Sequence, residues 1–293
     1  MPKGRIIKLT GGNYYVDDQN EVYKCRGRGR FRNENISPKV GDICEFQIEN
    51  VNEGYILEID ERKNELVRPS IVNVDQALII TSCKDPEFST NLLDRFLVLT
   101  EFNNIESILI FSKIDLVTEK DMPKILEYKE YYQSLGYQVF LTHPEDDKTN
   151  NLVKECFTDR LTVIVGQSGV GKSTLLNAID SSLQIKTGET SKALGRGRHT
   201  TRHTEFIKVN NGLVADTPGF SNLEFIDIDE VDLKHNFKEI FELSQECKYR
   251  GCMHLNEPHC AVKKAVEAGE MAEYRYINYK KFYEEIKNRK PRY

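Results

Sequence analysis

Hydrophobic and polar positions in the first 68 residues alternate as they do in β-strands, with turn residues between the runs. An apolar run ends at Gly11-Gly12 and is followed by aromatic and β-branched residues. Hydrophobic and polar residues alternate in part over residues 40–60. Asn52 to Gly54 interrupts this alternation and is predicted to form the tip of a hairpin. About five short strands in this space predict a small closed barrel, of which the OB-fold is the common nucleic-acid-binding example.

Strand and helix patterns alternate from residue 69 to residue 226. Apolar runs at 73–82, 107–113 and 161–167 have the composition of buried parallel strands. Helical spacing covers residues 91–103. Residues 121–136 predict a second helix, with an Asp N-cap, Pro in the first turn and Gly at the end. This alternation predicts a doubly wound α/β domain.

The last segment, residues 227–293, is predicted to be helical around a cysteine cluster. Apolar and aromatic residues recur at helical spacing from Val262 to Ile286, opposite a lysine-rich face. We interpret this tail as an amphipathic helix that packs on the neighbouring domain; contact with RNA is the alternative. The predicted domains are therefore 1–68, 69–226 and 227–293.

Composition narrows the class of protein. The chain has 293 residues, 39% of them hydrophobic and 30% charged, which is enough to build a sizeable core. No apolar run approaches the roughly 20 residues of a membrane span, and the start lacks the apolar stretch of a secretory signal. Seven cysteines without a signal indicate thiols or metal ligands rather than disulfides. We expect a soluble, cytoplasmic monomer.

The net charge of −5 argues by itself against a protein that coats nucleic acid. However, residues 1–68 carry 12 basic and 12 acidic side chains and residues 227–293 carry 13 of each, so the acidic excess lies between them. Five cations occupy every second position of one segment: Lys24, Arg26, Arg28, Arg30 and Arg32. In an extended chain they share one face, and Gly27 and Gly29 would let the backbone approach a ligand. We interpret the segment as a phosphate-backbone contact for RNA or DNA; a solvated loop is the alternative.

The sequence GQSGVGKS, residues 166–173, lies between an apolar strand and a helical run, which is the context that a phosphate-binding P-loop requires. Backbone N–H groups would surround the phosphates, Lys172 would neutralise the β- and γ-oxygens, and the Ser173 hydroxyl would ligate Mg²⁺. The residues expected to contact the nucleotide here are Gly166, Gln167, Ser168, Gly169, Val170, Gly171, Lys172, Ser173 and Thr174.

Two further motifs complete the expected nucleotide site. DTPG begins at Asp216, after the strand GLVA, where an acid supports Mg²⁺ and the Gly219 N–H can contact the γ-phosphate. SKID comprises Ser112 to Asp115: the Asp115 carboxylate can accept two hydrogen bonds from guanine, which adenine cannot offer, and Lys113 can lie along the ring. Ser112 stands where GTPases usually have Asn or Thr, so it keeps a hydroxyl but loses an amide. Thr142 is a weaker candidate to close the base pocket.

Cysteine and histidine spacing indicates a metal site near the C-terminus. Cys247, Cys252, His254 and Cys260 form the pattern C-x₄-C-x-H-x₅-C, and three thiolates with one imidazole can close a tetrahedral structural Zn²⁺ site. His259 is a competing ligand. The remaining cysteines are expected to be ordinary small buried residues: Cys25, Cys44, Cys83 and Cys156.

The base-reading motif SKID precedes the P-loop, whereas ordinary GTPases have the reverse order, so the domain is expected to be circularly permuted. DTPG then leads directly into the C-terminal domain. In these motifs, and in NLLDRFL, GRGRHTT and the cysteine pattern, the chain resembles the circularly permuted ribosome-assembly GTPases of the RsgA (YjeQ) family. The resemblance implies an OB-fold, a permuted GTPase domain and a zinc domain. It also implies GTP hydrolysis that the small ribosomal subunit stimulates, late in maturation of that subunit.

The hydrolytic residues follow from GRGRHTT, residues 195–201. Phe220 occupies the position after DTPG where many GTPases place a water-orienting Gln, so another polar group must act. Thr201 or Thr200 is the candidate for Mg²⁺ and γ-phosphate contact. His199 is the candidate to position or polarise the water, as the similar family suggests; contact with RNA phosphate is its alternative role.

Two rival functions remain at this stage. One is a P-loop ATPase or small-molecule kinase, which Asp115 argues against. The other is a nucleotide-gated RNA-binding module with incidental hydrolysis, which Phe220 and the flanking cations would suit.

Overall fold

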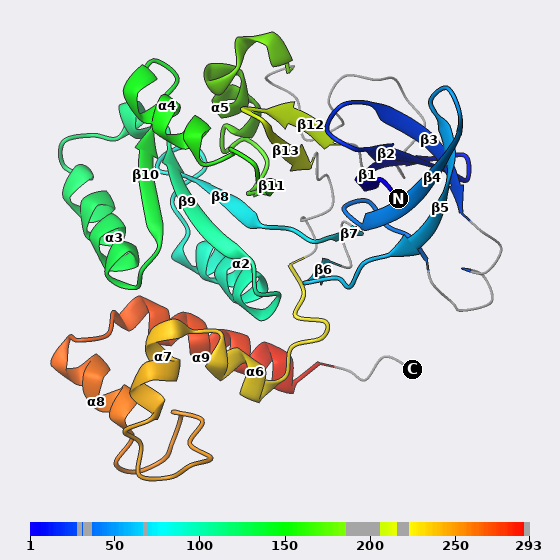
Figure 1. Cartoon of the computed structure of the whole chain (residues 1–293). Coiled ribbons are helices and arrows are strands. Elements are labelled where there is room, and N and C mark those ends of the chain that lie inside the picture. Colours follow the sequence, from blue (N-terminus) through cyan, green and yellow to red (C-terminus); the bar gives the residue numbers. More distant parts are fainter. Residues whose placement is uncertain (28–30, 32–36, 67–69, 186–205, 216–222, 290–293) are drawn as a thin grey trace. The chain divides into compact units, whose positions relative to one another are not determined.

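The computed structural model describes residues 1–27, 31, 37–66, 70–185, 206–215 and 223–289 (Figure 1). The chain forms two compact units, the first from residues 1–78 and 144–222 and the second from residues 79–143 and 223–293. Among the described helices, none has the length and apolar character needed to cross a membrane.

The N-terminal strands form a closed barrel in the order β1-β2-β3-β5-β4. Neighbouring strands are antiparallel except β3 and β5, which are parallel. The strands are β1 (Lys3–Thr10), β2 (Asn13–Asp17), β3 (Val22–Gly27), β4 (Ile43–Asn50) and β5 (Glu53–Ile59). Ile6, Val16, Phe46 and Ile56 are fully buried inside the barrel because alternate side chains of each strand point inward. The predicted barrel is confirmed.

A six-stranded sheet, in the order β10-β9-β8-β11-β13-β12, forms the centre of the α/β part of the chain. Its strands are β8 (Gln76–Ser82), β9 (Glu106–Ser112), β10 (Gln138–Thr142), β11 (Leu161–Val165), β12 (Phe206–Val209) and β13 (Gly212–Ala215). β10 pairs with β9, and β11 with β13, in parallel, whereas β12 is antiparallel to β13. The short strands β6 (Glu65–Leu66) and β7 (Ile71–Val72) pair with each other. The three predicted central strands are confirmed, with ends shifted by at most three residues.

Helices alternate with these strands. They are α2 (Thr90–Phe102), α3 (Met122–Ser134), α4 (Asp147–Glu155) and α5 (Lys172–Ile179), with short 3₁₀ turns η1 (Ile114–Leu116) and η2 (Ser181–Leu183). Asp121 is the N-cap residue of α3, as predicted, but its carboxylate makes no capping hydrogen bond and instead accepts one from the Thr118 hydroxyl at 2.8 Å. Gly136 follows α3 with φ +84°, a conformation that glycine adopts without strain.

The C-terminal helices belong to the second unit, together with α2, α3, β9 and β10. They are α6 (Glu230–His235), α7 (Lys238–Ser244), α8 (Ala261–Ala268) and α9 (Glu273–Lys287). Tyr279, Phe282 and Ile286 of α9 are buried in one core with Val98 of α2 and Val262 of α8. The packing interpretation of the tail is therefore confirmed for α9.

The predicted cationic segment lies only partly within the described residues. Lys24 and Arg26 of β3 are exposed on one face of the strand, as its alternation predicts, whereas Arg28, Arg30 and Arg32 lie outside the described residues. Ligand approach at Gly27 stays a prediction, and the structure gives this glycine a packing reason as well. A Cβ atom at Gly27 would lie 3.3 Å from the Tyr14 ring, so glycine leaves room for a side chain of the protein itself.

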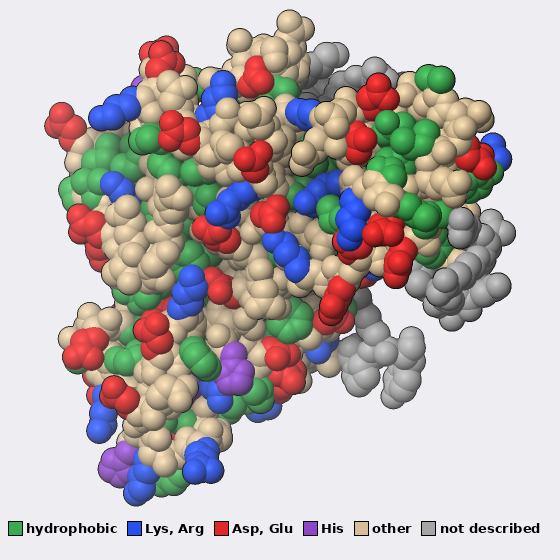
Figure 2. Space-filling model, in the orientation of Figure 1, with side chains coloured by type: hydrophobic (Ala, Val, Ile, Leu, Met, Phe, Trp, Pro, Cys, Tyr) green, Lys and Arg blue, Asp and Glu red, His purple; other side chains and the backbone are tan. Residues whose placement is uncertain are grey.

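Charged side chains of both signs are mixed over the face shown in Figure 2. Lys and Arg do not gather there into one large area from which Asp and Glu are excluded. This face therefore presents no broad cationic area among the described residues.

Candidate nucleotide site and metal centre

The phosphate loop joins the end of β11 to the start of α5. Gly169 and Gly171 have φ values of +80° and +95°, which a residue with a side chain adopts only under strain. Gly171 is the N-cap of α5, so the N–H groups of the first helical turn, beginning at Lys172, have no intrahelical acceptor. Val170 is buried and anchors the loop. A strand, a tight glycine turn and an open helix N-terminus therefore produce the geometry that binds a phosphate chain.

Lys172 reaches back across this loop. Its Nζ donates to the Gly166 carbonyl at 2.8 Å and to the Gln167 carbonyl at 2.6 Å. Burial lowers the pKa of this ammonium group. A cation held at this place, over a loop of backbone N–H groups, is suited to the β- and γ-phosphate oxygens, which are stronger acceptors than the carbonyls it contacts here.

The SKID motif lies in the second unit, where β9 ends. Ser112 is the last residue of β9, is buried, and donates its hydroxyl proton to the Thr81 carbonyl at 3.2 Å. Lys113 adopts the left-handed conformation, with φ +58°, and its Nζ donates to the Asp85 carbonyl. Asp115 is exposed within η1. Thr142 ends the neighbouring strand β10, directly opposite Ser112 in register.

The candidate switch residues lie outside the described residues. They are His199, Thr200, Thr201, Asp216 and Gly219, together with Phe220. Their roles therefore stay predictions. The strand GLVA that leads to Asp216 is confirmed as β13.

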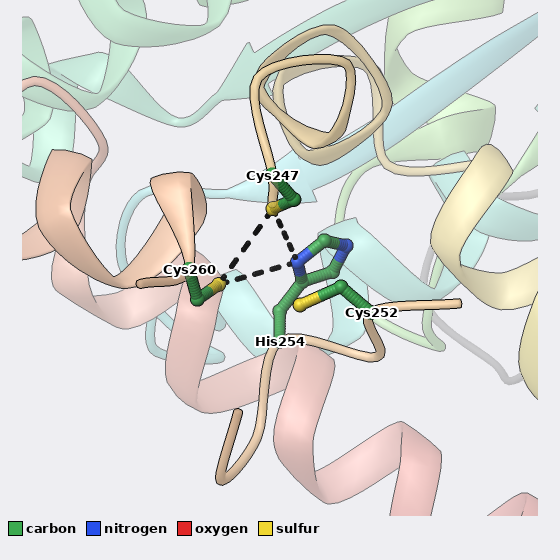
Figure 3. Close-up of side chains that lie close together, drawn as sticks. All are labelled: Cys247, Cys252, His254 and Cys260. Carbon is green, nitrogen blue, oxygen red and sulfur yellow. Dashed lines mark hydrogen bonds between the residues drawn. The ribbon is translucent and has the colours of Figure 1, made fainter. Parts of the chain in front are cut away.

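The four predicted metal ligands lie together in the second unit (Figure 3). Cys247 Sγ is 3.9 Å from Cys260 Sγ, and His254 Nδ1 is 3.6 Å from Cys247 Sγ and 3.4 Å from Cys260 Sγ. Cys252 Sγ is the fourth donor atom, and all four donor atoms lie within 4.8 Å of one another. A tetrahedron with ordinary zinc bonds has edges of about 3.8 Å between sulfurs and about 3.5 Å between sulfur and nitrogen. The donor set therefore fits one tetrahedral Zn²⁺.

Neighbouring groups hold this cluster in place. The Tyr276 hydroxyl donates to the His254 carbonyl at 2.7 Å, and the Tyr279 hydroxyl donates to the Met253 carbonyl at 2.9 Å. Both carboxylate oxygens of Glu257 accept backbone N–H groups within the same loop. Cys260 is the N-cap residue of α8, at the positive end of the helix dipole, although burial raises the pKa of its thiol in the metal-free loop. The metal loop is therefore shaped by α9 and α8.

Electrostatics favour the ligand form of the histidine. Burial, with a smaller effect of the Lys234 charge, lowers the pKa of His254 to about 4, so the imidazole is neutral near pH 7. Neutral imidazole is the form that binds a metal. His259, the competing ligand in the sequence, is exposed and lies outside the cluster.

The other cysteines divide into two groups. Cys25, Cys44 and Cys83 are buried, as predicted, and burial raises the pKa of Cys25 to about 11 and that of Cys44 and Cys83 to about 12. These thiols stay protonated and unreactive near pH 7. The prediction is wrong for Cys156, which is only half-buried because it follows the surface helix α4.

A buried ionic cluster in the second unit escaped the sequence analysis. Arg275 of α9 donates to both carboxylate oxygens of Glu239 at 2.6 and 2.9 Å, and to Asp94 Oδ1 at 2.5 Å. Tyr132 and Asn278 each donate to Asp94 at 2.6 Å. Arg275 is 1% exposed and Asp94 is fully buried. The one signal in the sequence was Asp94 itself, a carboxylate on the apolar side of the helix NLLDRFL that must find a partner when buried.

Known proteins match the whole chain. A family model described as RsgA GTPase matches residues 59–226, and one described as RsgA N-terminal domain matches residues 3–56. A relative from Bacillus cereus, named small ribosomal subunit biogenesis GTPase RsgA, is 53% identical over 293 residues and covers 100% of both chains.

Two solved structures have the same fold. YloQ, described as a circularly permuted GTPase, has a TM-score of 0.86 and 50% identity and covers 100% of this chain and 97% of its own. YjeQ from Thermotoga maritima has a TM-score of 0.88 and 37% identity and covers 99% of each chain. The expected architecture, a barrel followed by a circularly permuted GTPase domain and a helical domain with a Cys₃His cluster, is confirmed. The chain therefore belongs to the RsgA GTPase family, a family of GTP hydrolases.

Proposed function

We propose that this protein hydrolyses GTP to GDP and phosphate while it is bound to the small ribosomal subunit, late in maturation of that subunit. The subunit stimulates hydrolysis, and hydrolysis leads to release. The B. cereus relative is named a small ribosomal subunit biogenesis GTPase, which supports this partner. The carrying observation in the structure is the glycine turn before α5, with Lys172 extended across it. We further propose that the protein acts in the cytoplasm, where ribosomal subunits mature, and acts as a monomer.

We propose the nucleotide contacts that the sequence predicts. The loop from Gly166 to Thr174 would hold the phosphates, while Asp115 and Lys113 would contact guanine beside Ser112. Ser173 and Thr201 would hold Mg²⁺, which when bound neutralises charge that develops on the phosphate oxygens. Gly219 would contact the γ-phosphate, and Asp216 would support the metal through its carboxylate.

Base choice is the first property to test. Asp115→Asn replaces an acceptor with a donor, which favours xanthine, because xanthine carries an oxygen where guanine carries an amino group. We expect GTP affinity to fall about 10- to 100-fold, from the loss of hydrogen bonds to a charged acceptor, and xanthosine triphosphate affinity to rise. Competition binding measures both. Equal affinity of the unmodified protein for ATP and GTP would instead favour the rival ATPase or kinase.

The hydrolytic step is tested at His199. We propose that His199 positions the attacking water, so His199→Ala should keep GTP affinity and lose about 100-fold or more of the subunit-stimulated turnover. Unchanged stimulated turnover would remove this assignment. Loss of subunit binding in place of turnover would support the RNA-contact role.

We propose one structural Zn²⁺ on Cys247, Cys252, His254 and Cys260. The match between their separations and the edges of a zinc tetrahedron supports it. Four protein ligands leave no open position, so the metal would stabilise the loop rather than catalyse a reaction.

Ribosomal RNA is the proposed contact of the barrel and the C-terminal domain. Lys24 and Arg26, exposed on one face of β3, support this for the barrel. Co-sedimentation with small subunits in GDP and in a non-hydrolysable GTP analogue tests the partner and its nucleotide dependence together. A hydrolysis rate that small subunits leave unchanged would favour the rival RNA-binding module.

A further inference from the structure

The loop between β8 and α2, residues 83–89, lies beside the SKID motif. β8 ends at Ser82 and β9 ends at Ser112, and the two strands are neighbours in the sheet. Beyond the end of β8, the Cys83 N–H still donates to the Ser112 carbonyl at 2.9 Å. The first residue of the loop is therefore fixed to the strand that carries the motif.

Lys113 extends its side chain to this loop. It follows β9 in the left-handed conformation, with φ +58°, and its Nζ donates to the Asp85 carbonyl. A backbone carbonyl thus holds the ammonium end of the side chain, and the position of the loop sets the position of that carbonyl.

The ring of Phe88 anchors the loop. Its centre lies 4.8 Å from that of the Phe111 ring in β9, edge to face, and 4.9 Å from that of the Tyr128 ring in α3, with an angle of 10° between the stacked rings. Aromatic pairs in these geometries stabilise one another beyond the area that they bury. Phe88 therefore ties the loop to both β9 and α3.

Both ends of the loop make further local contacts. The Lys84 ammonium pairs with Asp121, the N-cap residue of α3, at 3.6 Å. At the other end, the Ser89 hydroxyl accepts a backbone N–H at 3.3 Å and caps α2. The Lys84 pair is exposed and contributes little by itself, so the ring of Phe88 is the main anchor between these ends.

Holding Lys113 in advance favours the binding of a ring along its side chain. A free lysine side chain loses rotamer freedom when a ligand packs along it. Lys113 is already held at its ammonium end, so folding has removed part of that freedom. We propose that Phe88 is a positioning residue of the guanine site, because its two ring contacts fix the loop whose Asp85 carbonyl orients Lys113. This inference rests on the proposed function, in which Lys113 contacts guanine, and adds a residue that acts through Lys113.

The test is a double-mutant cycle measured as affinity for GDP. Phe88→Leu removes both ring contacts but keeps an apolar side chain. We expect it to lower GDP affinity about three- to tenfold, because Lys113 must then be ordered when the nucleotide binds. In the Lys113→Met protein, which has no ammonium group to hold, Phe88→Leu should change GDP affinity by less than about twofold. Titration calorimetry measures all four affinities.

Two controls separate positioning from folding. Pyrophosphate carries no guanine ring, so the Phe88→Leu protein should bind it as tightly as the unmodified protein does. Tyr128 provides a matched pair of variants on the other side of the stack. Tyr128→Leu removes the ring and should weaken GDP binding, whereas Tyr128→Phe keeps the stacked ring and should leave it unchanged.

The possible outcomes are distinct. An equal loss of GDP affinity from Phe88→Leu in both backgrounds, or an equal loss of pyrophosphate affinity, would overturn the inference and assign Phe88 a purely structural role. If Phe88→Leu does not fold, the Tyr128 variants decide, and equal GDP affinities of Tyr128→Leu and Tyr128→Phe would overturn it as well. If Asp115→Asn and Lys113→Met both leave GDP affinity unchanged, the proposed guanine site fails and not this assignment alone.

Discussion

The phosphate loop and the metal loop are both built to hold a ligand, but they differ in what satisfies their polar groups. In the phosphate loop, Lys172 donates to two carbonyls of its own loop. In the metal loop, three sulfurs and one imidazole nitrogen face one another (Figure 3). Thiolates brought this close repel each other unless a cation lies between them.

This difference matches the expected lifetime of each ligand. A nucleotide must leave after hydrolysis. When it leaves, the ammonium group of Lys172 still has hydrogen-bond acceptors in its own loop, so the loop loses little stability. A structural metal is permanent, so its ligands need no alternative partners. Three experiments sharpen the comparison.

Removal of the metal should have the largest effect. Structural Zn²⁺ binds zinc-finger peptides with about 10–16 kcal/mol, far above the stability of one loop. We expect chelation, or Cys252→Ser, to unfold residues 247–260 and to release one Zn²⁺ per chain, while GTP still binds. Zinc analysis and hydrogen exchange measure both effects.

His259→Ala is the matched control for that experiment, because His259 is a nearby exposed histidine outside the cluster. It should retain its zinc. Zinc loss in this variant would contradict the proposed ligand set. If the metal loop kept its structure after complete chelation, the conclusion that this loop depends on its ligand more than the phosphate loop does would be wrong.

Lys172→Ala should have an intermediate effect. A hydrogen bond to a charged group contributes about 1.5–3 kcal/mol, so nucleotide affinity should fall about 10- to 100-fold. The free energy of unfolding of the nucleotide-free protein should change by less than about 1 kcal/mol, because water can replace the ammonium at two backbone carbonyls. Titration calorimetry and denaturant unfolding measure the two quantities. A large loss of stability would show that the lysine is structural.

Tyr276→Phe should have the smallest effect. It removes the hydroxyl that donates to the His254 carbonyl at 2.7 Å and leaves all four ligands in place. Outer partners of metal ligands typically contribute about 10- to 100-fold in affinity, and we expect the lower end, because this hydrogen bond reaches the backbone rather than the ring. Competition with a zinc chelator measures it. Tyr283→Phe, on the same helix, is the control and should not change zinc affinity.

Local patterns were enough to predict much of the fold and the site. Strand alternation predicted the barrel, apolar runs predicted β8, β9 and β11, and ligand spacing predicted the metal cluster. These features depend on residues close together in the sequence, where side-chain direction follows directly from helix or strand geometry. The prediction for Cys156 was wrong because the solvent exposure of a single residue depends on what packs over it.

By itself, the sequence determined the order of the motifs, the glycine turn of the phosphate loop and the composition of the metal site, three cysteines and one histidine. Tertiary structure decided which histidine faces the sulfurs, because His254 and His259 are both within reach along the chain and packing buries only the first. It also decided that Arg275 pairs with Asp94, 181 residues earlier, and that Arg95 holds Leu223. Such pairs have no sequence periodicity, since they form only when segments far apart in the sequence pack together and bury polar groups.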